Sequence, residues 1–229
     1  FQSARFTAPV ALVDAALDLA PDQPELRVLR GEWLLRELAW APPERQRDLA
    51  TGALIAADSA LRRRADDPAA LALCAVANAA LGRLVQARTV SDRLLQLHPD
   101  VWLSRVARAE VEAAAGDELA ALRWLRSAVQ LRGDDFLRAR YAALLDRIYE
   151  GIRVDLAERR YSDVRERCRK LAEIAPEEII ARLTAADTFR LAGDLPQAIA
   201  AVEALYAERP QDREVIQRLA SLLEAVGDG

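Results

Sequence analysis

The chain has 229 residues, of which 52% are hydrophobic and 30% charged, with only nine glycines and a formal net charge of −4. This composition predicts a soluble, helix-rich protein with enough apolar surface for a continuous core. No stretch of the sequence is apolar over the length that a bilayer-spanning helix needs, which excludes a membrane segment within these residues.

Apolar residues at helical spacing, in runs that end at proline or glycine, predict helices along the whole chain. The first helix is predicted over residues 9–19, the second over 25–40 and the third over 43–64. Pro43 suits the first turn of a helix, where a backbone N–H has no helical acceptor in any case.

Two regular, alanine-rich segments follow, over residues 68–101 and 102–135. Alanine is the best helix former, and small side chains let two helices approach closely. We therefore expect each segment to be a pair of packed helices.

A sustained apolar stripe then predicts one long helix, with Asp134 or Asp135 as its N-terminal cap. Gly151 lies within this stripe, and a glycine there costs a helix about 1 kcal/mol relative to alanine. It either interrupts the helix or marks a close helix crossing. The partner helix is predicted over residues 161–175. The stripe consists of Leu137, Tyr141, Leu144, Leu145, Ile148, Tyr149, Ile152 and Leu156.

Glycines recur at a fixed interval. Gly82 and Gly116 are 34 residues apart, and so are Gly193 and Gly227. The interval from Gly116 to Gly193 is 77 residues, which is two periods plus nine. A period of 34 residues indicates stacked helix-turn-helix repeats, and the remainder predicts an insertion in one of them.

The best-preserved repeat spans residues 179–212, and it resembles the tetratricopeptide repeat (TPR) family, whose pattern includes small residues, an aromatic residue, Gly-Asp, Ala and Pro. Its matching residues are Ala185, Ala186, Phe189, Gly193, Asp194, Ala198, Val202, Leu205 and Pro210. In the last repeat they are Ile216, Leu219, Ala220, Leu223, Gly227 and Asp228. The chain departs from the family's pattern where Asn78 and Glu112 replace the aromatic residue, where Arg159-Arg160 replace Gly-Asp, and at Arg182, where a large apolar residue is usual.

The resemblance implies an all-α fold, a right-handed TPR-like α-solenoid of stacked antiparallel helix pairs, with about five to six degenerate repeats of which two are elongated. The insertion is expected between Gly133 and Arg159. We expect one domain over residues 1–229, and the incomplete outer repeats indicate part of a longer array. The repeats are predicted over residues 9–21 (partial), 25–67, 68–101, 102–135, 136–178, 179–212 and 213–229 (partial).

The sequence offers no catalytic, cofactor-binding or metal-binding constellation. Its one histidine, His98, precedes Pro99 in a predicted turn, and no set of residues supports a histidine-based triad. Cys74 and Cys168 fall on apolar helical positions of repeats that are not adjacent, so we interpret both as small core residues rather than as a disulfide. We expect no enzymatic activity and no cofactor.

Four basic residues cluster on one predicted helix: Arg165, Arg167, Arg169 and Lys170. Acidic residues interleave with them, which is typical of a solvated helix face. The alternative is a docking patch for an acidic partner.

The resemblance also implies that the first helix of each repeat lines a concave groove. In the alanine-rich repeats this predicts an apolar strip, which includes Ala69, Ala79 and Ala113. An amphipathic helix of another protein fits such a strip, whereas the alternative is that these side chains only pack neighbouring repeats. The predicted groove residues are Ala72, Val76, Leu103, Val106, Glu110, Leu183 and Asp187.

These groove residues disfavour one class of partner. TPR proteins that hold the acidic tails of chaperones use Lys, Asn and Arg at the inner-helix positions, and here those positions carry apolar or acidic residues. The resemblance therefore implies that this chain does not bind acidic chaperone tails.

The predicted function is a protein-binding scaffold within a larger bacterial protein, because repeat stacking produces an extended surface rather than an enclosed reactive cavity. Lys170 is the only lysine among 32 basic residues, and this bias is typical of a GC-rich bacterial gene. Similar arrays occur in the periplasmic region of exopolysaccharide-export proteins and in cytoplasmic assembly factors. The alternatives are a sensor array attached to an ATPase or DNA-binding domain, and an RNA-binding helical repeat, which the mild acidity disfavours.

Overall fold

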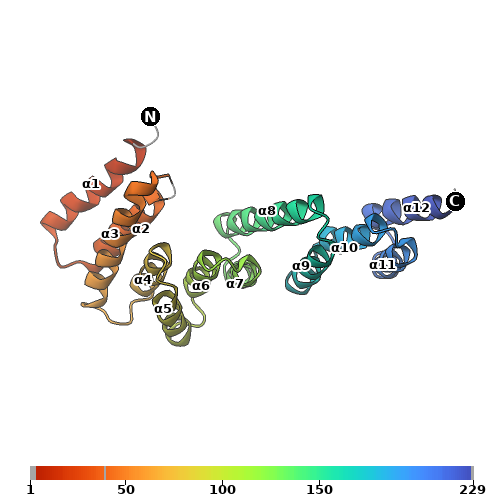
Figure 1. The fold of residues 1–229 in the computed structure, drawn as a ribbon. Coiled ribbons are helices and arrows are strands. Elements are labelled where there is room, and N and C mark those ends of the chain that lie inside the picture. Colours follow the sequence, from red (N-terminus) through yellow and green to blue (C-terminus); the bar gives the residue numbers. More distant parts are fainter. Residues whose placement is uncertain (1–3, 39, 228–229) are drawn as a thin grey trace. The chain divides into compact units, whose positions relative to one another are not determined.

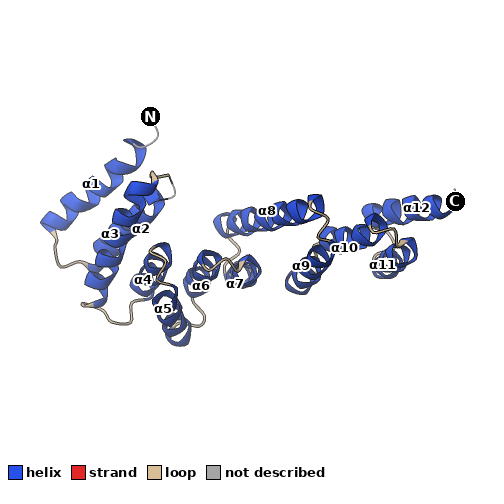
Figure 2. Cartoon of the chain, in the orientation of Figure 1, coloured by secondary structure: helices blue, strands red, loops and turns tan. Residues whose placement is uncertain are grey.

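The structure, a computed structural model, describes residues 4–38 and 40–227, and the regular secondary structure of these residues is entirely α-helical (Figure 1, Figure 2). The predicted all-α fold of helical repeats is confirmed. The helices are α1 (Ala4–Leu19), α2 (Pro24–Leu38), α3 (Pro43–Leu61), α4 (Pro68–Ala80), α5 (Leu84–Leu97), α6 (Trp102–Ala114), α7 (Glu118–Leu131), α8 (Asp135–Ala157), α9 (Tyr161–Ile174), α10 (Ile179–Leu191), α11 (Leu195–Glu208) and α12 (Arg213–Gly227).

The helix ends differ most from the predicted ones in two places. Helix α1 begins at Ala4 and not at Pro9, so that Pro9 lies inside the helix. Helix α3 ends at Leu61, and the three arginines that follow it belong to the turn before α4.

Packing divides the chain into two compact units, residues 1–142 and 143–229, with the border inside α8. We call them unit 1 and unit 2. In unit 1, α2 packs on α3, α4 on α5 and α6 on α7, while α3 and α5 also pack on the first helix of the next pair. In unit 2, α10 packs on both α9 and α11, and α11 packs on α12. The single domain expected over residues 1–229 stays a prediction.

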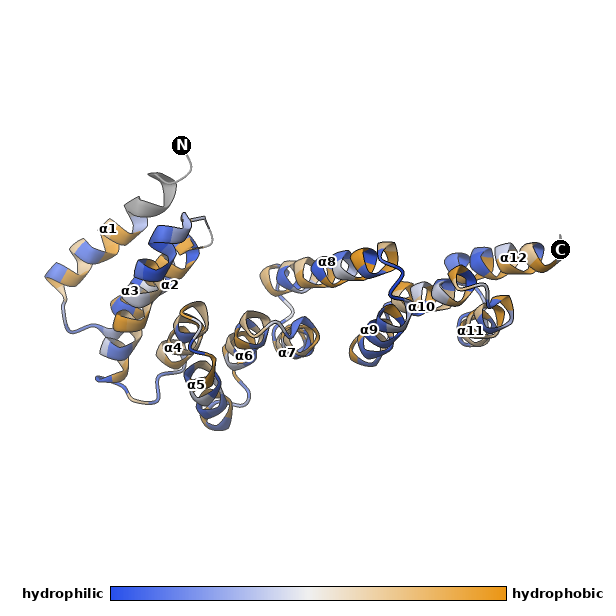
Figure 3. Cartoon of the chain, in the orientation of Figure 1, coloured by the Kyte–Doolittle hydropathy of each residue, from blue (hydrophilic) through white to orange (hydrophobic). Residues whose placement is uncertain are grey.

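Amphipathic helices supply the cores of both units, and Figure 3 shows hydrophobic and hydrophilic residues side by side along the helices. In unit 1 the core between α3 and α4 is built largely from alanine, including the fully buried Ala53, Ala57, Ala70 and Ala77. Larger side chains fill the core of unit 2, where Val202 and Leu205 of α11 share a cluster with Leu222 of α12. Burial of each such large side chain contributes about 1.5–3 kcal/mol.

Helix α8 runs for 23 residues without a break at Gly151, so the predicted long helix is confirmed. The glycine does mark a close approach, but by a side chain rather than by a second backbone. A Cβ atom at residue 151 would overlap Nη1 of Arg167, which reaches over from α9.

Four first helices, α4, α6, α8 and α10, end in the same turn. The residue after the turn donates its backbone N–H to the carbonyl five residues earlier, as Asp194 does to Phe189 at 2.9 Å and Asp117 to Glu112 at 3.0 Å. This hydrogen bond requires a left-handed residue in the turn, and glycine adopts that conformation without steric cost. The left-handed residues are Gly82 (φ 72°), Gly116 (φ 83°), Gly193 (φ 84°) and Arg159 (φ 58°).

The aspartate after the glycine begins the second helix. The carboxylate of Asp117 accepts the N–H of Ala120 at 2.9 Å, and that of Asp194 accepts the N–H of Gln197 at 3.1 Å. Each of these two Gly-Asp pairs therefore ends one helix and caps the next, whereas Asp228 of the predicted pair Gly227-Asp228 lies outside the described residues. Asp134, rather than Asp135, caps α8 in the same way, through the N–H of Leu137 at 2.9 Å.

Arg159 is the one non-glycine residue with a positive φ among the described residues, so this turn carries steric strain. We predict that Arg159→Gly stabilises the chain by about 1 kcal/mol, measured as a higher urea midpoint. Arg159→Ala is the matched control, because it removes the same charge but keeps a Cβ atom. A stabilisation by alanine equal to that by glycine would attribute the gain to charge and contradict the strain.

Candidate functional site

The first helices of successive repeats lie against one another in unit 1. Helix α4 contacts α6 and also α2, whereas no comparable contact joins the second helices α5 and α7 in this part of the described chain. The first helices therefore form the closer-packed, inner side of this stack.

The structure brings together five of the seven predicted groove residues. Ala72 and Val76 lie on α4, and Leu103, Val106 and Glu110 lie on the neighbouring α6. Leu183 and Asp187 lie on α10 in unit 2, which is described separately.

Most of the predicted apolar strip is engaged between helices. Val106 is 6% exposed, Ala72 is buried beside Leu94, and Leu183 belongs to the core of unit 2. Val76 and Leu103 are only partly buried against the same cluster as Ala72. Because Ala72 and Val106 are buried, packing between repeats is the favoured role at these two positions. Val76 and Leu103 are the predicted groove residues of unit 1 that keep accessible apolar surface.

The two acidic groove residues hold consecutive first helices together. Glu110 of α6 forms an ion pair with Arg140 of α8, and Asp187 of α10 forms one with Arg218 of α12. Asp187 also lies 3.6 Å from Arg190. Each carboxylate occupies the same position of its repeat, so the pairing is a recurrent link between neighbouring first helices.

A second set of buried groups occupies the aromatic position of the repeat. Phe189 stands there in the best-preserved repeat, with the guanidinium of Arg165 4.7 Å from its ring centre. In the three preceding repeats the position holds Asn78, Glu112 and Asp155, all of them buried. The sequence shows that the aromatic residue is replaced, but it does not show that the polar replacements are buried.

Each buried polar group has partners that offset its desolvation. Asn78 donates to the Cys74 carbonyl at 2.9 Å. Glu112 accepts from Arg88 at 2.8 Å and from Arg108 at 2.7 Å. The spacing of Arg108 and Glu112, four residues apart on one helix, is the only sequence signal that indicates this pairing.

Asp155 is the equivalent carboxylate of unit 2. It accepts from Arg160 at 3.1 Å, and its second oxygen lies 3.2 Å from Arg167. Arg167 is the side chain that passes over Gly151. Gly151 therefore leaves space for the guanidinium of Arg167, and the carboxylate of Asp155, one turn later on α8, pairs with it.

The predicted basic patch is neutralised largely within the chain. Arg165 lies over Phe189 and Arg167 pairs with Asp155, while Arg169 lies 2.7 Å and Lys170 3.4 Å from Glu166. Hydrogen bonds from Arg169 and then from Lys170 lower the pKa of the Glu166 carboxyl to about 2. This mixed face fits a solvated surface, and docking of an acidic partner here stays a prediction.

The histidine and the cysteines have structural contacts. Nε2 of His98 lies 2.7 Å from the carbonyl oxygen of Asp66, which joins the turns of two successive repeats. Cys74 and Cys168 are buried free thiols, and burial raises the pKa of each to about 11. Among the described residues, no group of His, Cys, Asp and Glu is arranged to hold a metal ion. No described helix has the length and apolar character to cross a bilayer.

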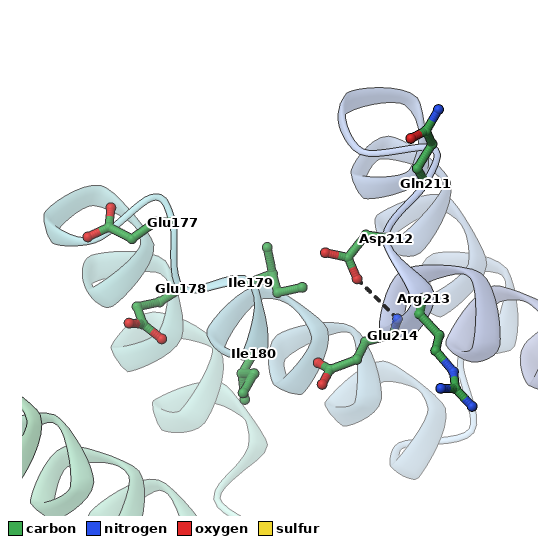
Figure 4. Close-up of a pocket in the computed structure, with 8 residues that line it drawn as sticks. All are labelled: Glu177, Glu178, Ile179, Ile180, Gln211, Asp212, Arg213 and Glu214. Atoms are coloured by element: carbon green, nitrogen blue, oxygen red, sulfur yellow. Dashed lines mark hydrogen bonds between the residues drawn. The ribbon is translucent and has the colours of Figure 1, made fainter.

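A hollow in unit 2 lies where the N-terminal ends of α10 and α12 approach each other (Figure 4). It is open to solvent, with a volume of about 500 Å³. Asp212 accepts the backbone N–H of Glu214 at 3.0 Å, and burial together with the charge of Glu177 raises the pKa of Glu178. The hollow is lined by Glu177, Glu178, Ile179, Ile180, Gln211, Asp212, Arg213 and Glu214.

Comparison with known proteins identifies the fold. No family model matches the chain, and no curated protein matches it. The Cut9-Hcn1 structure of the APC/C is 12% identical with a TM-score of 0.51, over 96% of this chain and 40% of that one. A monomeric mutant of IFIT1 with m7Gppp-AAAA is 15% identical with a TM-score of 0.50, over 96% of this chain and 55% of that one. The TPR protein TTC0263 of Thermus thermophilus is 19% identical with a TM-score of 0.47, over 96% and 91% of the two chains.

The burial of Val106 has a direct consequence for stability. We predict that Val106→Arg lowers the free energy of unfolding by about 3–5 kcal/mol, because it places an unpaired charge at a buried position of α6. Ala114→Arg is the control, since Ala114 is exposed on the same helix and the change should cost less than about 0.5 kcal/mol. Thermal melting followed by circular dichroism measures both. A Val106→Arg variant that melts like the native chain would place this side chain in an open groove.

Proposed function

We propose that this helical-repeat chain, which has the fold of TPR proteins, is a scaffold that binds a segment of another protein. The first helices of unit 1 supply the binding surface. The observation that carries the proposal is the pair of partly exposed apolar residues, Val76 and Leu103, on the inner side of adjoining repeats. Apolar anchors at helical spacing are what an amphipathic helix requires when it lies in a groove.

The charges beside these anchors restrict the partner. Glu110 lies one turn beyond Val106 on α6 and is already paired with Arg140. An acidic chaperone tail therefore finds no free cation at the predicted groove positions of unit 1. A partner with an apolar face and neutral or basic flanks fits this surface better.

Within this function we propose a place in a bacterial assembly, as the periplasmic TPR region of an exopolysaccharide-export protein. The arginine-rich, alanine-rich composition and the degenerate repeats support it. The test is deletion of the gene in its source organism together with fractionation of the encoded protein. Loss of secreted polysaccharide and recovery of the protein in the periplasm are expected, and normal secretion would contradict the proposal.

The binding surface is tested with two variants that make the same change on opposite sides of unit 1. Val76→Glu alters the inner side, whereas Val85→Glu alters α5, where the valine is 75% exposed. With the immobilised chain as bait in an extract of its source organism, the Val85→Glu variant should retain the protein that the native chain retains. The Val76→Glu variant should lose most of it, because binding of the partner's apolar face would bury the new carboxylate without a hydrogen-bond partner.

Thermal melting of both variants is the control for folding. Equal retention by a folded Val76→Glu variant would contradict binding at this surface. Binding of single-stranded RNA with a steep salt dependence would instead favour the RNA-binding alternative.

A further inference from the structure

The hollow between the N-terminal ends of α10 and α12 has an apolar wall as well as acidic residues. Ile180 of α10 lines it, and this side chain is 48% exposed. Helices α9 and α11 both pack on α10 and leave Ile180 accessible. A large apolar side chain on the wall of an open hollow of about 500 Å³ offers a partner apolar area to bury.

Two carboxylates flank this side chain. Figure 4 draws Ile180 between Glu178, which precedes α10, and Glu214 in the first turn of α12. The guanidinium of Arg213 points away from them in the same view. Neither Glu178 nor Glu214 forms an ion pair within the part of the chain that the structure describes. The hollow therefore combines an accessible apolar residue with two uncompensated negative charges.

The lack of a cation sets this hollow apart, because many acidic side chains of this protein pair with arginine. In the same unit, Glu208 lies 2.5 Å from Arg182. Burial, and then the charge of the neighbouring Glu177, raise the pKa of the Glu178 carboxyl, so its charged form is disfavoured where it stands. A cation placed beside Glu178 would offset this penalty.

We propose that this hollow binds a segment of a partner protein that presents a cationic side chain next to an apolar one. The apolar side chain packs on Ile180, and the cation lies between Glu178 and Glu214. Charge complementarity selects this occupant, because four of the eight residues that line the hollow are acidic and one is basic. A neutral or acidic segment would exclude water from the two carboxylates without compensating their charge.

Arginine is the cation that suits the hollow best. Its planar guanidinium has five N–H donors and binds carboxylates in pairs of hydrogen bonds, whereas the ammonium of lysine is a strongly hydrated point charge. The inference adds a second surface, in unit 2, to the proposed scaffold. It does not rest on Val76 or Leu103, which lie in unit 1.

The probe is a fluorescein-labelled octapeptide of alternating leucine and arginine, and fluorescence polarisation follows its binding to the whole chain. The control peptide has citrulline in place of arginine, because citrulline keeps the shape of the side chain and removes its charge. We expect the arginine peptide to bind at least about tenfold more tightly than the citrulline peptide. Salt at about 1 M should weaken the binding, because it screens accessible charges.

Neutralisation of the two carboxylates provides the first matched pair of variants. The double variant Glu178→Gln, Glu214→Gln removes both charges of the hollow. Its control, Glu203→Gln, Glu224→Gln, removes the same net charge from exposed positions of α11 and α12 that do not line the hollow. We expect the dissociation constant of the arginine peptide to rise more than about tenfold for the first double variant and less than about twofold for the control.

Two residues of equal exposure on α10 test the apolar wall. Ile180 and Leu191 are both 48% exposed, but Ile180 lines the hollow and Leu191 lies at the other end of the helix. Ile180→Ala should weaken peptide binding about fivefold or more, and Leu191→Ala less than about twofold. Val76→Glu should leave it unchanged, which separates a failure of this proposal from a failure of the groove in unit 1. Melting followed by circular dichroism checks that each variant is folded.

Three results would overturn the proposal. One is an absence of binding to the native chain at peptide concentrations up to about 1 mM. Another is equal binding of the citrulline peptide, or equal binding by the Glu178→Gln, Glu214→Gln variant, since either would place the peptide elsewhere. The third is displacement of the peptide by about 1 mM calcium chloride at constant ionic strength, because the carboxylates would then serve a divalent cation.

Discussion

The left-handed turn at the end of α4, α6, α8 and α10 is the constraint on which their repeats depend. It reverses the chain in few residues and satisfies carbonyls that the helix end leaves open. The same hydrogen bond recurs from Arg83 to Asn78, Asp117 to Glu112, Arg160 to Asp155 and Asp194 to Phe189, at 2.9–3.0 Å in every case. With the turn fixed, the second helix returns along the first, and alanines at the crossing let the pair close.

The carbonyl that accepts this hydrogen bond belongs to the residue at the aromatic position. The backbone of that residue therefore closes the turn, while its side chain packs within the repeat. Where that residue is Phe189, a guanidinium stacks on it. Where it is Glu112 or Asp155, arginines from the same unit neutralise it. Replacement of one large apolar side chain by a satisfied ion pair preserves the geometry of the repeat, which explains how sequences so degenerate keep one fold.

The helices could be predicted because their signals lie in short stretches of the sequence. Helical periodicity, proline stops, the Gly-Asp turns and the stripe through Gly151 all depend on residues close in sequence, and they gave the helices to within a few residues. The candidate site was less predictable, because exposure depends on neighbouring helices. Val106 and Val76 look alike in a groove pattern, yet Val106 is buried and Val76 is only partly buried. The partners Arg140 and Arg218 lie 30 and 31 residues from Glu110 and Asp187, beyond any local pattern.

The strictest test of this account concerns the repeat that lacks glycine. Amide hydrogen exchange, resolved by NMR, reports on the N–H groups of Arg83, Asp117, Arg160 and Asp194. If one turn closes all four first helices, the amide of Arg160 exchanges as slowly as the other three, within the stability of its unit. An Arg160 amide that exchanges at the rate of an unprotected peptide, beside three protected ones, would show that Arg159 does not form the turn and that the repeats do not share this constraint.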